Sequence, residues 1–568
     1  MAGLRWRWFR EALAHALGRL GLLGRARRIR IRAALVINPA IRRLEREEHR
    51  RFIRFDREYG ALVGHAFATG AGRTALVVSS RCPTIEGELF TIKTLQSAGF
   101  TPVVLLDDER RGLRPYYERA GVREVRLWSE FLTTSDYSHT AAAIVGRCQS
   151  MEDALACTHA GVRVGMIAVC TSLRRLRVGN LDLEMPGVRA LLVRSIAASM
   201  CATAEAERIL RAVRPAIVLT DTEYTPKGEF FETCLNDGLE VVAQDTGHRT
   251  NTLMLKRYRR HNRDEHVTTL SANSWAFVRR LDWSRHRRES LASEIETSYM
   301  TGDWFSTPWN RADGRAKEPA ELRRLLGLDP AKKTAFIFPH MLWDAPVMWG
   351  KPLFRSYEEW FVETVAAACH NTRVNWVIKI HPALIWKQAD EGYGGDSAEV
   401  RVLREQIGPL PPHIKVIPPD SPLSTFCLFA VMDYCLTVRG TVGVEAARLG
   451  IPVLTAGPAR YSEKGFTVDS SNRAEYLGRL ARIEEIPPMS DEERELAGRF
   501  AYGLFMLRPL RLTTVTWTDT YSTGRAKTIN RRAHVNVRTA DDWRRAADLT
   551  SLADWFVSRD DDFLAPAQ

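Results

Sequence analysis

Short apolar runs rich in valine and isoleucine recur along the second half of the chain. They occupy 374–378, 414–417 and 434–436, and polar turns or segments of helical length separate them. Continuous β-branched runs are typical of strands that are buried on both faces, and intervening helices are typical of a parallel sheet. The pattern therefore predicts a doubly wound α/β domain over about 331–485.

The first half of the chain repeats this alternation. At 568 residues, the chain is longer than one hydrophobic core usually supports, so two domains are expected. We predict an N-terminal Rossmann-like domain at 73–270, an interdomain region at 271–330, and C-terminal helices and a tail at 486–568. The predicted strands of the first domain are 74–80, 101–106, 124–128, 215–219 and 239–243, with helical segments 140–160, 190–212 and 230–236 between them.

The N-terminal segment 1–60 is predicted to be basic and helical. Its first 32 residues carry nine arginines against the single acid Glu11, and the whole chain has a net charge of +13. Trp6, Phe9 and Leu13 recur at helical spacing among these arginines. Such a helix is expected to lie on an anionic membrane surface, which predicts a cytoplasmic protein peripheral to the inner membrane face. The alternatives are a helix packed on the domain and an arm that binds a partner protein.

Several classes of protein are not indicated. No apolar run of about 18 residues predicts a transmembrane helix. The nine cysteines are scattered without a C-x-x-C pair, so neither a zinc site nor a disulfide framework is expected. No nucleic-acid-binding motif is present, so no nucleic acid is expected as a partner.

Two polar motifs follow predicted strands of the second domain. One is K-x-H-P at 379–382, and the other is a loop of small residues at 437–443 that leads into an apolar helical segment. Ligands of parallel sheets bind at the carboxyl ends of strands, and the N-terminus of a helix favours phosphate. The alternative for the second motif is a tight turn that needs glycine only for its backbone angles.

Together these motifs resemble those of a known family. K-x-H-P at 379–382, G-T-x-G-x-E-A at 440–446 and G-x-P-V at 450–453 resemble the C-terminal half of GT-B glycosyltransferases that use cytidine nucleotide donors, a group that includes capsule enzymes and Kdo transferases. The stretch G-x-A-x-Y at 457–461 is similar to the capsule group. The resemblance covers roughly 336–467. It implies a GT-B fold, in which two Rossmann-like domains face a central cleft.

The resemblance also implies roles for individual residues. His381 is expected to stabilise charge on the leaving cytidine phosphate, and Glu86 or Glu88 to act as the base. The family usually has serine where this chain has Arg439 and Thr441. No cofactor and no metal ion are expected. The predicted donor-binding residues are His340, Lys379, Pro382, Ser424, Thr437, Arg439, Gly440, Thr441, Gly443 and Glu445.

Acceptor or sugar contacts are sought at the strand ends of the first domain. Two polar clusters follow the predicted strands 215–219 and 239–243. Arginine offers a two-pronged fork to a carboxylate or phosphate, although a histidine in a polar loop is more often only solvated. Trp343, Trp349 and Trp360 are either core or cleft-wall aromatics, and the core is favoured. The predicted acceptor or sugar contacts are Asp221, Glu223, Asp245, His248 and Arg249.

These patterns lead to one functional hypothesis and two alternatives. The first is a glycosyltransferase that moves Kdo or another acidic sugar from a CMP-activated donor to a glycan or glycolipid acceptor in bacterial surface polysaccharide assembly. The second is a polyol-phosphate transferase with a CDP-activated donor, which needs a second histidine near the phosphate, either His340 or His413. The third is a non-catalytic GT-B scaffold of a polysaccharide assembly complex.

Overall fold

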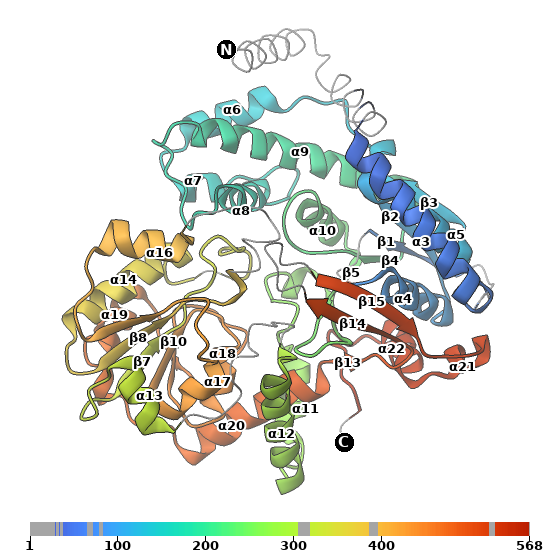
Figure 1. Ribbon diagram of the computed structural model, residues 1–568. Coiled ribbons are helices and arrows are strands. Elements are labelled where there is room, and N and C mark those ends of the chain that lie inside the picture. Colours follow the sequence, from blue (N-terminus) through green and yellow to red (C-terminus); the bar gives the residue numbers. More distant parts are fainter. Residues whose placement is uncertain are drawn as a thin grey trace.

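The computed structural model describes residues 29, 33, 38–64, 67, 72–78, 83–304, 318–350, 352–384, 396–521 and 529–566. Within these ranges the chain forms two α/β units side by side (Figure 1). Apart from Ile29, the segment 1–32 lies outside the described residues. No helix in the described part of the chain is long and apolar enough to cross a membrane.

The first sheet has seven strands within the described ranges, in the order β13-β6-β5-β4-β1-β2-β3. All neighbours are parallel except β6, which runs antiparallel to β5 and β13. The chain passes from β1 outward to β3 and then returns to β4 beside β1, so the order reverses between β1 and β4. The strands are β1 (Arg73–Val77), β2 (Phe100–Leu106), β3 (Glu124–Leu127), β4 (Ile217–Leu219), β5 (Glu240–Thr246), β6 (Thr252–Tyr258) and β13 (Leu510–Arg511).

Alternate residues of these strands face two separate cores, as the two-residue period of a strand requires. Ala75 and Val77 of β1 pack with α4 (Ile85–Ser97) and α22 (Ala547–Val557), whereas Leu76 packs on the other face. That second face is covered by α9 (Val188–Val213) and α10 (Lys227–Asn236). Helices α3 (Pro39–Val63) and α5 (Arg114–Arg119) pack at the β2–β3 end.

The second sheet is entirely parallel, with six strands in the described residues in the order β12-β11-β10-β7-β8-β9. Helices α14 (Tyr357–His370) and α19 (Arg473–Leu480) cover one face. Helices α18 (Val442–Ala447) and α20 (Asp491–Tyr502) cover the other. The strands are β7 (Thr334–Ile337), β8 (Asn375–Lys379), β9 (Ile414–Ile417), β10 (Tyr434–Thr437), β11 (Val453–Thr455) and β12 (Val468–Asp469). The predicted fold class, two Rossmann-like domains of the GT-B type, is confirmed.

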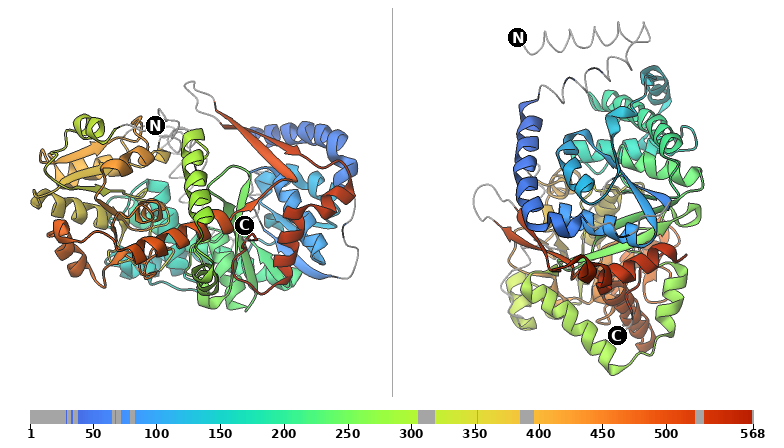
Figure 2. Two further views of the ribbon diagram at one scale, coloured as in Figure 1. Left: turned by 90° about the horizontal axis from the view of Figure 1, so that it is seen from below. Right: turned by 90° about the vertical axis from the view of Figure 1, so that its right-hand side faces the viewer.

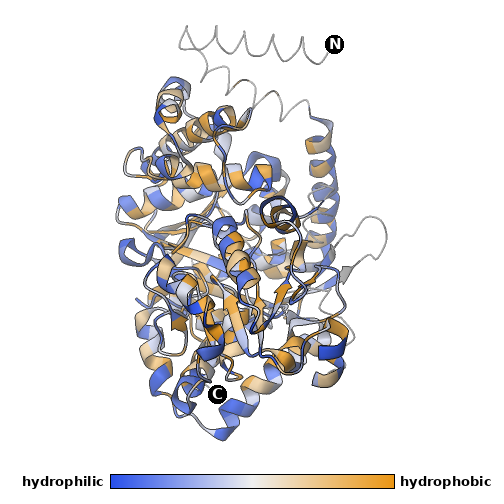
Figure 3. Ribbon diagram, turned by 90° about the vertical axis from the view of Figure 1, so that its left-hand side faces the viewer, coloured by the Kyte–Doolittle hydropathy of each residue, from blue (hydrophilic) through white to orange (hydrophobic). Residues whose placement is uncertain are grey.

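The two domains are joined by packed apolar residues as well as by the chain. Buried residues of α6 (Ser138–Arg147), α7 (Met151–Leu155) and α8 (Val164–Leu176) share one core with α14 and α16 (Ala398–Val402). The strands contain mostly hydrophobic residues, whereas the outer helices alternate between hydrophobic and hydrophilic residues (Figure 3). The short helices α13 (Pro319–Leu326) and α17 (Thr425–Leu428) contribute to the same core as α18 and contact the turn Phe429–Val431.

The C-terminal tail belongs to the first domain. After α20 the chain enters β13, the two-stranded sheet of β14 (Val515–Tyr521) and β15 (Ile529–Val535), and helices α21 (Ala540–Arg545) and α22. Figure 2 shows this red segment crossing from the second domain to the first. Helices α11 (Ala272–Arg280) and α12 (Arg285–Thr301) pack against α20 at the crossing. The strand β6, the pairing of β13 with it and the β14–β15 hairpin were not predicted.

Candidate functional site

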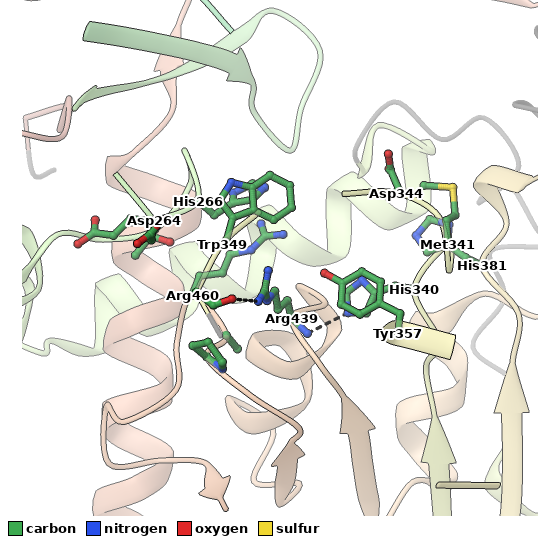
Figure 4. Close-up of a pocket in the computed structure, with 15 residues that line it drawn as sticks. Asp264, His266, His340, Met341, Asp344, Trp349, Tyr357, His381, Arg439 and Arg460 are labelled. Carbon is green, nitrogen blue, oxygen red and sulfur yellow. Dashed lines mark hydrogen bonds between the residues drawn. The ribbon is translucent and has the colours of Figure 1, made fainter. Parts of the chain in front are cut away.

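A cavity of about 280 Å³ lies where the second domain meets the segment after β6 (Figure 4). Its walls come from the loops that follow β7, β8, β10 and β11, so the cavity is at the carboxyl ends of the parallel strands. This is the position at which sheets of this kind bind ligands. The first domain contributes Asp264, Glu265, His266 and Thr269, and the second contributes His340, Met341, Asp344, Trp349, Gly350, Tyr357, His381, Arg439, Pro458, Ala459 and Arg460.

His340 is held in one orientation at the floor of this cavity. Its ring stacks on Tyr357, with 4.6 Å between ring centroids. The backbone N–H of Arg439 donates to Nε2 of His340 at 2.9 Å, so in the neutral ring the hydrogen is on Nδ1. Burial, together with the charge of Arg439, lowers the pKa of His340 to about 3. His340 is therefore a neutral hydrogen-bonding group and not a cation.

We expect the His340 imidazole to stay neutral between about pH 5 and pH 8, where an ordinary histidine changes charge. Because its pKa is lower in the folded than in the unfolded chain, its contribution to stability is present above the ordinary value of 6.5 and is lost as the pH falls toward 3. NMR titration of the ring resonances, assigned with a His340→Asn variant, measures this directly. A midpoint near 6.5 would contradict the prediction.

Arg439 brings a buried positive charge to the cavity. Its side chain is 4% exposed, and Nη2 donates to the carbonyl oxygen of Gly350 at 3.3 Å. Nε and Nη1 of Arg439 are buried and have no hydrogen-bond partner among the described residues. A buried guanidinium group with unused donors is costly unless an anion binds it. The arrangement favours a phosphate or carboxylate ligand.

Arg460 adds a second guanidinium group to the same cavity. Its Nη1 donates to Oγ1 of Thr268 at 2.7 Å. Burial lowers the pKa of Arg460, and the charge of Arg439 lowers it further, while Asp245 acts in the opposite direction. Because the charge of Arg439 disfavours the charge of Arg460, an anionic ligand in this cavity would stabilise the site.

The wall on the side of the first domain was missed by sequence reasoning. The rings of His266 and Trp349 contact each other at 4.6 Å between centroids. The N–H of Thr268 donates to Nδ1 of His266 at 3.2 Å, and Asp264 pairs with Arg163 at 2.6 Å. These residues lie in a charged, irregular stretch without a strand pattern, so no sequence signal distinguished them.

The three tryptophans differ in their positions. Trp343 and Trp360 are each 1% exposed and belong to the core, as predicted. For Trp349 the prediction of a core position was wrong, because this side chain is only half-buried and lines the cavity.

Of the predicted donor-binding and catalytic residues, His340, His381 and Arg439 line the cavity. His381 is exposed, and its Nδ1 accepts from the N–H of Ala383 at 3.1 Å. Thr437 does not border the cavity but lies next to His340, with 3.5 Å between its Oγ1 and Nε2 of His340. These predicted residues therefore lie at or next to the cavity, and their roles stay predictions.

The loop of small residues after β10 is closely packed against Tyr461. The hydroxyl of Tyr461 donates to the carbonyl oxygen of Gly440 at 2.7 Å. A Cβ atom on Gly443 would lie 2.1 Å from the hydroxyl oxygen of Tyr461, so glycine is needed there for packing. Gly440, Thr441 and Gly443 do not border the cavity, and the interpretation of this loop as a structural turn accounts for its glycines.

Four other predicted donor-binding residues also lie away from the cavity. Lys379 is buried in β8, where burial lowers its pKa to about 8. Ser424 accepts from the N–H of Cys427 at 3.2 Å and caps α17. Glu445 is 1% exposed and accepts from the hydroxyl of Tyr299, and burial raises its pKa to about 7. Pro382 is half-buried beside His381 and does not border the cavity.

The predicted acceptor contacts do not border this cavity either. His248 is 1% exposed and its Nε2 is 2.9 Å from Oε1 of Glu294. Arg249 pairs with the same carboxylate at 2.8 Å, so both residues tie the β5–β6 turn to α12. Asp221 pairs with Lys227 at 3.3 Å, and Asp245 accepts from the N–H of Thr246 at 2.8 Å. Glu223 is half-buried near the end of β4.

The two glutamates predicted as the base lie in the first turn of α4. Glu88 is 4% exposed, pairs with Arg110 at 2.9 Å and accepts from the hydroxyl of Tyr117. Glu86 borders a separate cavity of about 870 Å³ beneath α3, and burial raises its pKa. Neither residue borders the cavity of His381. Carboxylates that do border it are Asp264, Glu265 and Asp344.

A metal centre was not predicted. Within the described ranges, no group of three or more histidine, cysteine, aspartate or glutamate side chains is arranged to hold a metal ion. Metal-independent chemistry stays a prediction.

Comparisons with known proteins return similarities of fold. No protein-family model matches this chain, and neither does any curated protein sequence. Among solved structures, the β-Kdo 2,4-transferase KpsC of Thermosulfurimonas dismutans is 15% identical, with 52% of this chain and 81% of that chain covered and a TM-score of 0.34. The β-Kdo 2,7-transferase KpsC of that organism is 15% identical, with 61% and 89% covered and a TM-score of 0.32.

A UDP-GlcNAc 2-epimerase from Neisseria meningitidis is also similar in fold. It is 11% identical, with 76% of this chain and 96% of that chain covered and a TM-score of 0.26. At TM-scores this low, the assignment of two Rossmann-like domains rests on the strand orders and on the shared core described above.

Proposed function

We propose that this protein is a glycosyltransferase that moves Kdo or another acidic sugar from a CMP-activated donor to a glycan or glycolipid acceptor in surface polysaccharide assembly. One observation carries the proposal. His340, His381, Arg439 and Arg460 meet around a single cavity at the carboxyl ends of β7, β8, β10 and β11. Such a CMP-activated sugar carries two anionic groups, the phosphate and the sugar carboxylate. The arginine and histidine side chains of this cavity are suited to bind both groups.

The residues fit the charge changes of this reaction. In the transfer, the bond between the anomeric carbon and the phosphate oxygen breaks, and its electron pair stays on the phosphate. The acceptor hydroxyl forms the new bond and gives its proton to a base. Arg439 and His381 would stabilise the charge that develops on the leaving phosphate, and Arg460 would pair with the sugar carboxylate.

Thermal unfolding with CMP, CDP, UDP and GDP tests the proposal. A ligand at about 100 times its dissociation constant stabilises the folded state by roughly 2.7 kcal/mol, which raises the unfolding midpoint. We expect CMP to raise the midpoint of the wild-type protein and to have little effect on a His381→Ala variant. Stabilisation by UDP or GDP alone would contradict the donor class, and no response to any nucleotide would favour the non-catalytic scaffold.

A polyol-phosphate transferase with a CDP-activated donor is the second candidate. The observation that favours it is the presence of two histidines, His340 and His381, at one cavity. His413, the other histidine considered for this role, does not border the cavity, and its Nε2 is 3.0 Å from the carbonyl oxygen of Ala368. Stronger stabilisation by CDP than by CMP would place this candidate first.

We propose a cytoplasmic location, peripheral on the inner membrane face, on the basis of the basic amphipathic sequence of residues 1–32. A glycolipid acceptor would be reached from that position. Fractionation of cells that express a chain lacking this segment tests it, and full retention in the membrane fraction would show that residues 1–32 are not required.

A further inference from the structure

One face of helix α3 carries arginines without any acidic residue. At about 100° per residue, the exposed side chains of α3 include an arc of about 140°. None of the five acidic residues of the helix falls within this arc. The arc, called here the arginine face, contains Arg42, Arg43, Arg46, His49, Arg50, Ile53 and Arg57, together with Arg54 at its edge, which also borders the cavity of about 870 Å³.

Two acids of α3 outside this arc, Glu45 and Asp56, hold the helix to the domain. Glu45 accepts from Nη2 of Arg111 at 2.8 Å, and Asp56 pairs with Arg119 at 2.6 Å. Phe52 and Phe55 pack on the ring of Tyr116, with centroid separations of 5.1 and 5.0 Å. Helix α3 is therefore fixed on the domain by one face, and the side chains of the arginine face are exposed. Figure 2 shows α3 at the margin of the molecule.

An exposed charged helix is usually only solvated, but this face has an unusual arrangement. Arg43, Arg46 and Arg50 follow one another at intervals of three and four residues, and like charges at this spacing destabilise a helix. An anionic surface would remove that repulsion. The helix has 25 residues and is about 37 Å long, so it presents the charges along a line that a flat surface can meet.

We infer that the arginine face of α3 docks the protein on a membrane that contains anionic phospholipids. Ile53, which is 48% exposed, lies near the middle of the arc, and an apolar side chain among arginines suits the headgroup region of a bilayer. The chain before α3 adds nine arginines with interspersed tryptophan and leucine, of the same chemical character. This inference does not depend on the proposed reaction.

Co-sedimentation of the full-length protein with vesicles tests the inference. The vesicles contain phosphatidylglycerol and phosphatidylcholine, or phosphatidylcholine alone. The test variant replaces Arg43, Arg46, Arg50 and Arg57 by glutamine. The control variant makes the same change in charge at exposed arginines of other surfaces, namely Arg211, Arg285, Arg404 and Arg482. Circular dichroism and the unfolding midpoint establish that both variants fold.

We expect the α3 variant to bind anionic vesicles at least about tenfold more weakly than the wild-type protein, since each arginine near an anionic surface contributes substantially to binding. The control variant should bind anionic vesicles with an affinity within about twofold of that of the wild-type protein. Added salt should weaken the binding of the wild-type protein. Equal binding by the α3 variant, or equal binding of the wild-type protein to neutral vesicles, would overturn the inference. Binding to an RNA or DNA oligonucleotide in preference to anionic vesicles would also overturn it, in favour of a nucleic acid.

Discussion

Replacement of Arg439 by methionine should abolish the rise in unfolding midpoint with CMP and lower kcat/KM by about 10²- to 10³-fold. The reason is that Nε and Nη1 of Arg439 are buried at the cavity without partners in the described protein, so an anionic ligand is their natural partner. Isothermal titration with the nucleotide and steady-state kinetics measure the two effects. An Arg439→Lys variant should recover part of the binding, because lysine keeps the charge but not the planar fork.

The stability of the unliganded Arg439→Met variant separates a ligand-binding role from a structural one. Removal of a buried charge that has few partners relieves its desolvation cost, so the unfolding midpoint should stay the same or rise. Arg508 is the matched control. It is also fully buried, but it donates to the carbonyl oxygens of Leu255 at 2.6 Å and Phe563 at 3.1 Å. An Arg508→Met variant should be strongly destabilised. A large loss of stability in Arg439→Met would contradict a role in ligand binding.

The second large effect is expected at Asp562, in the chain after α22. Its carboxylate is buried, pairs with Lys256 at 2.9 Å and lies 3.6 Å from Arg508. In an Asp562→Ala variant the buried Arg508 loses this neighbouring carboxylate and Lys256 keeps only Glu265, at 2.6 Å, which should cost about 3–5 kcal/mol of the free energy of unfolding. Urea denaturation measures this loss. The neighbouring Asp561 pairs with Arg259, which is partly exposed, and Asp561→Ala should cost only about 1 kcal/mol.

The contribution of the Asp562 carboxylate to stability depends on pH, because its pKa differs between the folded and the unfolded chain. Burial opposes its ionisation, but Arg508 and Lys256 outweigh burial and lower the pKa of Asp562 from 3.8 to about 2. Its contribution to stability is therefore present above pH 3.8 and is lost as the pH falls toward 2. The difference in unfolding free energy between the wild-type protein and Asp562→Ala should shrink across this interval. An Asp562→Ala variant no less stable than Asp561→Ala at neutral pH would contradict the assignment.

Lys256 and Arg508, the two cations beside Asp562, also contact the backbone next to the functional site. Arg508 donates to the carbonyl oxygen of Val267, and Nζ of Lys256 donates to that of Thr269 at 3.2 Å. These carbonyls belong to the segment that carries His266 and Thr269 to the cavity wall. The C-terminal tail, for which the sequence suggested no role, thus fixes one wall of the site.

The sequence alone determined the two domains, the parallel strands of the second domain and part of the site. These features depend on local patterns. Buried parallel strands require continuous apolar runs, and polar residues such as His340 and His381 directly follow β7 and β8 at the edge where ligands bind. Arg439 was located for the same reason, since it directly follows β10.

Only the tertiary structure decided which polar residues face the cavity. His248, Arg249, Glu88 and Glu445 have the sequence features of ligand-binding residues, but ion pairs and hydrogen bonds with distant elements occupy them. His266 reaches the cavity from a segment without a strand pattern, and Arg460 lies in the stretch 457–461 after β11, for which no ligand role was predicted. The physical reason is that a strand-end position is set by local periodicity, whereas the partner of a charged side chain is set by residues far apart in the chain.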